Sequence, residues 1–376
     1  MHIGFDAKRA FTNTSGLGNY SRFVVSGLVR LFPEHRYTLF TPRINPLFAN
    51  FYPESRNVEI AQPQGLARKA PALWRVAGMA SEFENRKIEV FHGLSNELPY
   101  GISGSKTKLV VTIHDLIFLR YPELYRLPDR LIYKRKFADA CKKANHIVAI
   151  SEQTRQDIIT YFGTNPSKIS VIYQDCDPVF QQPLPEAELS RVKAAYDLPQ
   201  KYILCVGTLE KRKNQLSLLK AWHQSGAADA YDLVLVGKQT AYAQELHTYI
   251  SAHKLNAKVH FPPYIPFADL PAIYQLASLF VYPSVFEGFG IPIVEALNSG
   301  VPVISSTGSC FSEAGGEGSV YVNPDSVTAL SGAIARVISD KQLQQGMRDQ
   351  GLRHALKFRA EKTIPELEAV YRKVLG

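Results

Sequence analysis

The stretch SVFEGFGIPIVEALNSGVPVISS, residues 284–306, predicts a strand, a glycine loop, a helix and a second strand in succession. Pro292 suits the first position of a helix, and Gly300 suits its end. Gly288 and Gly290 would let backbone N–H groups approach a ligand closely. Because a helix start carries the positive end of a dipole, the junction favours a phosphate-bearing ligand.

Two acids flank this junction eight positions apart. We expect Glu287, in the loop, to accept hydrogen bonds from sugar hydroxyls, and Glu295, in the first helical turn, to bind a ribose diol. Taken alone, this pair of acids could equally be two solvated side chains near a helix start, since the helix dipole favours acidic residues there too. Their combination with the glycines and the proline favours a ligand site.

Twelve short runs rich in apolar and β-branched residues alternate with helical patterns along the chain. Such runs indicate parallel strands buried on both faces. Twelve are too many for one doubly wound sheet of usual size, so we predict an α/β protein with two Rossmann-like sheets of about six strands. The runs are 2–7, 37–42, 88–93, 109–115, 146–151, 169–175, 202–210, 231–237, 258–264, 279–284, 301–306 and 319–324.

The domain boundary is expected in DPVFQQPLPEAELS, residues 177–190, which lacks a strand period and leads into a new β-α alternation. We place the linker at 177–185 and the second domain from residue 179.

Composition indicates a globular protein with a substantial core: of 376 residues, 45% are hydrophobic and 20% charged. No run reaches the roughly 18 apolar residues of a membrane span, and the start, MHIGFDAKRAF, lacks the apolar core of a secretory signal. The four cysteines are far apart, so we expect free thiols in a reducing cytoplasm.

The net charge of +9 is uneven. Residues 1–186 contain 24 Lys and Arg against 17 Asp and Glu, a net of +7, and the remainder contributes +2. The basic half favours an anionic partner.

A basic triplet, Lys211, Arg212 and Lys213, follows the strand that ends at Gly207. Ligands bind at the carboxyl edge of such a sheet. The cations could therefore neutralise the charge that builds on a leaving diphosphate.

Gly16 and Gly18 follow the first strand, and an amphipathic helix is expected after them. The dinucleotide fingerprint is incomplete, because Ser21 occupies the third glycine position and no acid ends the second strand. This argues against a dehydrogenase, but the loop could still bind a phosphate through its backbone N–H groups.

His114 lies at the end of an apolar strand. It could be a residue of a ligand-binding cleft or a structural histidine whose hydrogen bonds are satisfied within the core.

Asp175 and Asp177 match the Asp-x-Asp pattern of metal-dependent sugar transferases. No further acids or histidines lie close in sequence to complete a metal shell, so no metal is expected.

Together these stretches resemble the retaining glycosyltransferases of family 4, which have the GT-B fold. The motifs that carry the resemblance span nearly the whole chain, and the combination of TIHD, RYPE and GTLE-x-RKN is most similar to mannosyltransferases of bacterial surface-polysaccharide assembly. They are SGLGNYS, TIHDLIFLRYPELY, ANHIVAISEQTRQDI, VIYQDCDPVF, GTLEKRKN, EGFGIPIVEAL and GVPVISS.

The resemblance implies a role for each matching position. Arg212 and Lys213 would hold the donor diphosphate, Glu295 the ribose and Glu287 the transferred sugar, with His114 near its hydroxyls. Further donor contacts are implied for Gly16, Gly18, Gly207, Gly288, Phe289, Gly290, Ile291 and, beside the base, Tyr264 and Ile265. The final helix, 364–376, would return to the first domain, residues 1–178, and leave 179–363 as the nucleotide-sugar domain.

The chain departs from the family pattern twice. Thr208 stands where many members have Arg, so Arg212 would supply that charge. The junction has Gln174, Asp175, Cys176 and Asp177 where Asn-Gly-x-Asp is usual.

The resemblance also implies a reaction. A hexose, with GDP-mannose as the suggested donor, would pass to a saccharide or lipid-linked saccharide without a metal or other cofactor. The departing phosphate would help to deprotonate the acceptor. No nucleic acid is expected, because no RNP, KH or helix-turn-helix pattern is present.

The basic segment 65–83 could rest on an acidic membrane as an amphipathic helix, with Lys134, Arg135 and Lys136 adding charge. The protein would then be cytoplasmic and peripheral at the inner face of the membrane. Packing of the same helix on its own core is the competing interpretation. Competing functions are a nucleotide-sugar epimerase, a non-catalytic sugar-nucleotide sensor and a nucleic-acid-binding protein.

Overall fold

The computed structural model describes residues 1–102 and 106–376, apart from the side chains at 72, 76 and 77, and the chain divides into two units. Unit 1 comprises Met1–Asp175 and Phe358–Gly376, and unit 2 comprises Cys176–Lys357. The sequence-based boundaries lie a few residues later, at 178 and 364. Phe358 already belongs to unit 1, where its ring meets Tyr173 edge to face at 5.5 Å.

Unit 1 is built on a seven-stranded parallel sheet in the order β3-β2-β1-β4-β5-β6-β7. Most of its strand residues are buried, as expected of a sheet covered on both faces. The strands are β1 His2–Asp6, β2 Arg36–Phe40, β3 Val58–Ala61, β4 Val90–Gly93, β5 Lys108–Ile113, β6 His146–Ala149 and β7 Ile169–Val171.

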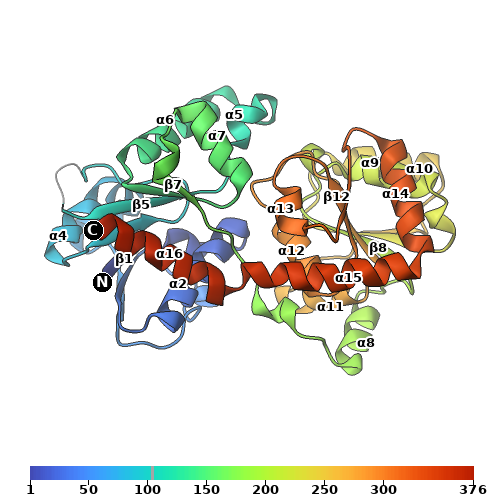
Figure 1. Cartoon of the computed structure of the whole chain (residues 1–376), viewed down its shortest axis with the longest axis horizontal. Helices are drawn as coiled ribbons and strands as arrows, with labels where there is room; N and C mark the ends of the chain where they lie inside the picture. The colour runs from blue at the N-terminus through green and yellow to red at the C-terminus, as the bar shows by residue number, and fades with distance from the viewer. Residues whose placement is uncertain (103–105) are drawn as a thin grey trace. The chain divides into compact units, whose positions relative to one another are not determined.

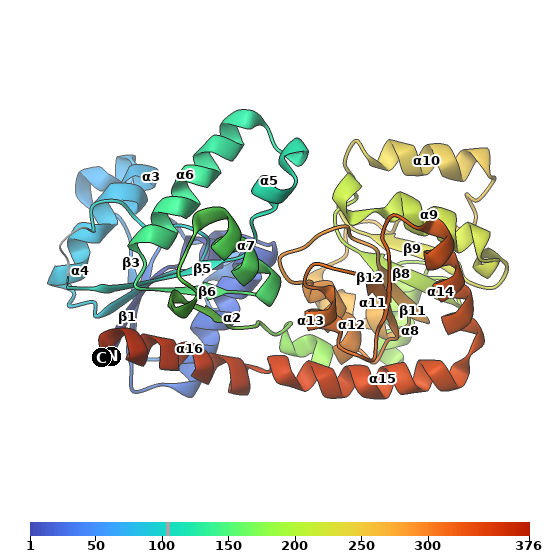
Figure 2. The same ribbon diagram turned by 45° about the horizontal axis from the view of Figure 1, so that its top comes forward.

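Helices cover both faces of this sheet. α16 packs on α2 on one side, while α6 and α7 lie on the other (Figure 2). The helices are α1 Lys8–Thr12, α2 Gly16–Leu31, α3 Pro71–Leu73, α4 Glu82–Asn85, α5 Ile117–Arg120, α6 Leu127–Lys143, α7 Glu152–Phe162 and α16 Ala360–Leu375. Short 3₁₀ turns are η1 Pro46–Phe48, η2 Gly65–Lys69, η4 Met79–Ser81, η5 Pro122–Leu124 and η6 Pro166–Lys168, and η3 Trp74–Gly78 is a π-helical stretch.

Unit 2 is built on a six-stranded parallel sheet in the order β10-β9-β8-β11-β12-β13. Its core includes the fully buried Trp222, whose indole N–H donates to the carbonyl of Tyr231 at 2.8 Å. The strands are β8 Tyr202–Val206, β9 Asp232–Val236, β10 Val259–His260, β11 Leu279–Tyr282, β12 Val303–Ser306 and β13 Val320–Val322.

In unit 2, α9 and α10 lie on one side of the sheet and α11 and α12 on the other (Figures 1 and 2). The helices are α8 Glu186–Ala195, α9 Gln215–Gln224, α10 Ala243–Ala252, α11 Leu270–Gln275, α12 Ile291–Asn298, α13 Phe311–Gly315, α14 Val327–Ser339 and α15 Lys341–Ala355. Short turns are η7 Pro178–Gln181, η8 Lys211–Lys213, η9 Ala227–Asp229 and η10 Phe267–Asp269, and a last turn, η11 Leu356–Phe358, spans the return of the chain to unit 1.

The prediction of two parallel α/β sheets is confirmed, and each of the twelve predicted strands coincides with an observed one. The additional strand is β3, at the edge of the first sheet. Its sequence, VEIA, is short, and Glu59 is exposed. A strand that is buried only in part lacks the continuous apolar run that marks the other strands.

The prediction of one amphipathic helix over 65–83 is confirmed only in part. Residues 65–69 form a separate 3₁₀ turn, η2. From Pro71 to Asn85 the chain is helical without a break but changes type, from α3 through the π-helical η3 and the 3₁₀-helical η4 to α4. Leu66 and Leu73 are exposed, but Arg75 is buried and ion-paired, so it is not a surface cation. Among the described helices, none is both long and apolar enough to cross a membrane.

Candidate active site

The basic triplet and the Glu287 loop follow neighbouring strands of unit 2. The triplet follows β8 and the loop follows β11, and these strands are adjacent where the strand order reverses direction. In open α/β sheets, ligands bind at the carboxyl ends of the strands at this point. A backbone hydrogen bond of 2.9 Å from Val285 N–H to the carbonyl of Arg212 ties the two loops together.

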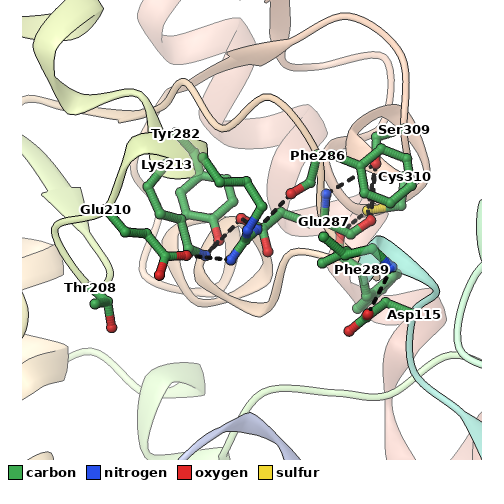
Figure 3. A network of polar contacts seen from close by, with 12 residues as sticks. Asp115, Thr208, Glu210, Lys213, Tyr282, Phe286, Glu287, Phe289, Ser309 and Cys310 are labelled. Carbon is green, nitrogen blue, oxygen red and sulfur yellow. Dashed lines mark hydrogen bonds and ion pairs between the residues drawn. The ribbon is translucent and has the colours of Figure 1, made fainter. Parts of the chain in front are cut away.

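Arg212 and Lys213 converge on one oxygen of Glu287. Arg212 Nη1 and Lys213 Nζ each lie 2.7 Å from Glu287 Oε1, and Arg212 Nη1 also donates to the carbonyl of Phe286 at 2.6 Å. All three side chains are at most 15% exposed, so solvent screens the interaction only weakly. The three residues that the sequence selected here form a single charged cluster, of which Figure 3 labels Lys213 and Glu287.

This cluster keeps Glu287 ionised. Burial alone would raise the pKa of its carboxyl, but the charges of Lys213 and Arg212 outweigh burial and lower the pKa to about 2. Burial acts to lower the pKa of Lys213, and the carboxylate of Glu287 reverses this and raises it. These three side chains comprise two cations and one carboxylate, and Glu210, which pairs with Arg212, adds a second carboxylate.

Two further residues orient the cations. Lys213 Nζ donates to the hydroxyl of Tyr282 at 2.6 Å and lies 4.9 Å from the centre of its ring. Arg212 Nη2 donates to Glu210 Oε1 at 2.6 Å. Neither role was predicted from the sequence, although Tyr282 ends β11 and Glu210 lies in the GTLEKRKN motif. A polar residue at the carboxyl end of a core strand is the signal that could have identified Tyr282.

The Glu287 loop is held from the other side by the start of α13. Ser309 Oγ donates to the carbonyl of Glu287 at 2.9 Å and accepts from its backbone N–H at 3.2 Å. The thiol of Cys310 donates to the carbonyl of Phe289 at 2.6 Å. Figure 3 shows Lys213 and Glu210 on one side of Glu287, with Ser309 and Cys310 on the opposite side. No feature of the sequence pointed to Ser309 or Cys310.

Two of the predicted glycines have backbone angles that favour glycine. Gly290, with φ of +115°, precedes α12, which begins at Ile291. Gly207, with φ of +146°, lies beside Lys213, whose Cε is 3.7 Å from the place where a Cβ would be. Gly237 was not predicted, yet an added Cβ there would lie 2.0 Å from the carbonyl oxygen of Gly207, so the ends of β8 and β9 can approach only with glycine at 237.

Glu295 occupies a different position from the one predicted. It is the fifth residue of α12, so it lies beyond the first helical turn, and its Oε2 accepts a hydrogen bond of 2.8 Å from Tyr274. Its carboxyl is buried. Burial, and to a lesser degree Asp177, raise its pKa to about 7, although the Tyr274 bond acts in the opposite direction. The helix begins at Ile291, one residue before the expected first position at Pro292, so the acid lies one residue further along the helix than expected.

His114 in unit 1 is held as a structural histidine would be. Its Nε2 lies 2.9 Å from the carbonyl oxygen of Leu94, and its ring meets Tyr20 edge to face at 4.6 Å. Burial lowers its pKa to about 4, so the ring is neutral near pH 7 and Nε2 carries the proton.

The two glycines of the first loop lie inside a helix instead of preceding it. α2 begins at Gly16, and an added Cβ on Gly18 would lie 2.0 Å from the carbonyl oxygen of Asn13. Position 18 therefore requires glycine because the backbone at Asn13, in the same unit, leaves no room for a side chain. Around Gly16 the space is open.

The remaining predicted donor contacts lie after strands of unit 2. Tyr264 and Ile265 follow β10, and the side chain of Tyr264 is 87% exposed. Gly288, Phe289 and Ile291 belong to the loop and helix start described above. Among the described residues, no group of three metal-ligating side chains is gathered, and the side chains of all four cysteines are buried.

Comparison with known families adds the chain's affiliation. Residues 14–178 match the family described as Glycosyltransferase Family 4, and residues 186–354 match the one described as Glycosyl transferases group 1. The chain belongs to the glycosyltransferases built from these two domains. The resemblance identified from the sequence motifs is thereby confirmed.

Two curated relatives of this glycosyltransferase are similar over long stretches. O-antigen chain mannosyltransferase B of Escherichia coli is 28% identical over 371 residues, which cover 95% of this chain and 96% of the relative. O-antigen chain mannosyltransferase RfbU of Salmonella typhimurium is 30% identical over 227 residues, which cover 60% of each chain.

A solved structure supports the fold of the glycosyltransferase. The crystal structure of Anabaena HepE in complex with UDP-glucose aligns with a TM-score of 0.77 and 18% identity over 99% of both chains. At this identity the comparison bears on architecture alone, and the GT-B fold predicted from the sequence is confirmed.

Proposed function

We propose that this glycosyltransferase moves a mannosyl residue from a nucleoside diphosphate sugar, GDP-mannose in our hypothesis, to a saccharide or lipid-linked saccharide. The observation that carries the proposal is the convergence of Arg212 and Lys213 on Glu287 at the carboxyl ends of β8 and β11. The mannosyl group is suggested by the two O-antigen mannosyltransferases to which the chain is similar.

In this mechanism the two cations exchange part of their interaction with Glu287 for the donor diphosphate. Their charge would stabilise the leaving nucleoside diphosphate, a preorganised electrostatic effect that requires no metal in our proposal. Glu287 remains ionised because of its low pKa, so its carboxylate can accept hydrogen bonds from the hydroxyls of the transferred sugar.

We further propose that transfer retains the configuration of the donor. A retaining double displacement needs a nucleophilic carboxylate within reach of the anomeric carbon. Glu287 is engaged by two cations, which makes it a poor nucleophile. We therefore favour a route in which the departing phosphate accepts the proton of the acceptor hydroxyl on the same face of the sugar.

The decisive variant is Lys213→Ala. Removing Lys213 takes away one of two cations at the leaving group, and we expect turnover of GDP-mannose to fall roughly 100-fold or more. Lys211→Ala is the matched control, since Lys211 belongs to the same triplet but is exposed, and its rate should stay within about twofold. Near-normal turnover by the Lys213 variant would remove the proposed role.

The donor and the stereochemistry can be tested separately. Among UDP, GDP and ADP, we expect GDP to raise the thermal unfolding temperature most, because GDP is the leaving group of the donor in our hypothesis. The shift is readily measured, since a ligand at a hundred times its Kd adds about 2.7 kcal/mol to the free energy of unfolding.

The product anomer is read by NMR, and α-linked mannose from an α-linked donor is the expected outcome. Conversion of the donor to a different nucleotide sugar without acceptor would favour the epimerase alternative instead.

For the membrane we propose a different surface from the one the sequence suggested. α6 and its lead-in expose Leu127, Leu131 and Ile132 by 61%, 60% and 52%, with the exposed cations Lys134 and Arg135 on the same helix. Exposed apolar side chains interleaved with cations fit an anionic lipid surface. We propose that α6 lies on such a surface and brings unit 1 to a lipid-linked acceptor.

A further inference from the structure

Glu210 is the most exposed member of the charged cluster in unit 2. Its side chain is 36% exposed, against 15% for Arg212 and 11% for Glu287. Figure 3 shows its carboxylate turned toward the cluster. The side chain does not cap the short turn η8 that follows it, and among the described residues its one partner is Arg212. Glu210 can therefore leave the cluster with the loss of a single ion pair.

Glu287, the other carboxylate of the cluster, is anchored far more firmly. Its Oε1 lies 2.7 Å from both Arg212 Nη1 and Lys213 Nζ. Its backbone N–H and carbonyl are both bonded to Ser309 Oγ. Removing a buried carboxylate from two cations costs more free energy than removing a partly exposed one from a single cation. An incoming anion would therefore displace Glu210 before Glu287.

Departure of Glu210 would open one edge of the Arg212 guanidinium. Nη1 is already engaged by Glu287 and by the carbonyl of Phe286. Nη2 donates to Glu210, and Nε has no partner among the described residues. Because Nε and Nη2 form a planar edge that can bind two oxygens of one phosphate in parallel, Glu210 occupies half of an edge suited to a phosphate.

The charge of the cluster supports the same exchange. With Glu210 in place, two carboxylates balance the two cations Arg212 and Lys213. A multiply charged anion is attracted only weakly to a balanced cluster. Once Glu210 moves away from Arg212, a surplus of positive charge remains for the ligand.

We propose that Glu210 is an internal counter-ion of Arg212 that the diphosphate of the donor displaces on binding. It returns to Arg212 as the nucleoside diphosphate leaves, and so assists product release. The inference rests on the proposed function, because it assumes that Arg212 binds the diphosphate. It adds that Glu210 lowers the affinity of the enzyme for this group.

The experiment measures binding to the full-length protein by isothermal titration calorimetry, with GDP, inorganic pyrophosphate and guanosine as probes. Glu210→Gln keeps the shape of the side chain and removes its charge. It should bind GDP and pyrophosphate about three- to tenfold more tightly than the wild type, and the difference should shrink as salt is raised. Guanosine, which has no phosphate, should bind the two proteins alike.

Turnover separates a counter-ion from a structural role. In Glu210→Gln the KM for GDP-mannose should fall by the same factor as the Kd for GDP, while kcat stays unchanged or falls, because the removed charge opposes bound donor and bound product alike. A higher kcat, or a higher KM, would contradict the counter-ion role.

Glu186→Gln is the matched control, since it removes the same charge from an exposed position of α8 in the same unit. It should bind GDP within about twofold of the wild type. Unchanged or weaker binding of GDP and pyrophosphate by Glu210→Gln, or equal tightening by the control, would overturn the inference.

The proposed function is tested independently of Glu210. Pyrophosphate carries the diphosphate without a base, so an error in the proposed base leaves the binding test intact. If Lys213→Ala loses turnover while Glu210→Gln binds pyrophosphate as the wild type does, only the counter-ion role fails. If Lys213→Ala keeps its turnover, the proposed function fails, whatever the affinity of the Glu210 variant.

Discussion

At the scale of single residues, the two glutamates of α12 and its preceding loop have opposite environments. Glu287 is surrounded by two cations, whereas Glu295 is buried beside the neutral hydroxyl of Tyr274. The same residue type, eight positions apart, is therefore held as an anion in one place and close to half protonated near neutral pH in the other. The pair offers a direct test of the site's electrostatics.

We predict that the two glutamates affect stability with opposite dependence on pH. The pKa of Glu295 is raised to about 7 on folding, so its contribution is greatest below pH 4.5 and is lost as the pH rises through 7. The pKa of Glu287 is lowered to about 2, so its contribution is present above pH 4.5 and is lost as the pH falls toward 2. Each effect amounts to about 3 kcal/mol at most.

Urea unfolding of the wild type, Glu287→Gln and Glu295→Gln between pH 3 and 8 checks this prediction. The difference between wild type and Glu295→Gln should shrink with rising pH, and the difference for Glu287→Gln should shrink with falling pH. Parallel pH profiles for all three proteins would contradict it.

The glycines of the first loop provide a second residue-scale prediction. Gly18→Ala should lower the free energy of unfolding by about 3 kcal/mol, because the new Cβ would lie 2.0 Å from the backbone oxygen of Asn13. Gly16→Ala, two positions away in open space, should change it by no more than about 0.5 kcal/mol. Thermal and urea denaturation measure both, and equal losses would show that the close approach to Asn13 does not govern stability.

At the scale of elements, α6 carries the proposed membrane contact. The double variant Leu127→Ser/Leu131→Ser should weaken binding to vesicles that contain phosphatidylglycerol at least tenfold, because two exposed apolar side chains would otherwise be buried in lipid. Co-sedimentation with vesicles checks this. The matched control is Leu66→Ser/Leu73→Ser, which changes two exposed leucines of the segment 65–83. Equal binding by both double variants and the wild type would exclude α6 as the contact.

At the scale of the whole molecule, the chain leaves unit 1 at Asp175 and returns to it at Phe358. The returning segment contains α16, which packs on α2 (Figure 1). It buries four large side chains, Ile364, Leu367, Val370 and Tyr371. The hydroxyl of Tyr371 also lies 2.7 Å from His92 Nδ1 in the core of unit 1. Unit 1 is therefore assembled from both ends of the printed sequence.

We predict that removal of residues 358–376 unfolds unit 1 and spares unit 2. The truncation removes these four buried side chains and that of Phe358, which is also buried, and together the five are worth about 8–15 kcal/mol, comparable to the whole stability of a domain. Hydrogen exchange should then be fast in β1 and β4 and remain slow in β8 and β11. Tyr371→Phe, which removes one hydroxyl and leaves the packing, should keep both units protected. Equal loss of protection in both units after truncation would contradict the prediction.

The sequence by itself determined the two parallel sheets, the family, and the grouping of Arg212, Lys213 and Glu287. Strand runs and their order place chain segments at one edge of a sheet, and Arg212 and Phe286 meet there although 74 positions separate them. Only the tertiary structure decided the partner of each polar side chain. Glu295 lies beside Tyr274, His114 beside the carbonyl of Leu94, and Arg75 between Asp6 and Glu97. Such contacts depend on packing between elements, because a buried polar group takes whichever partner the surrounding core brings within reach.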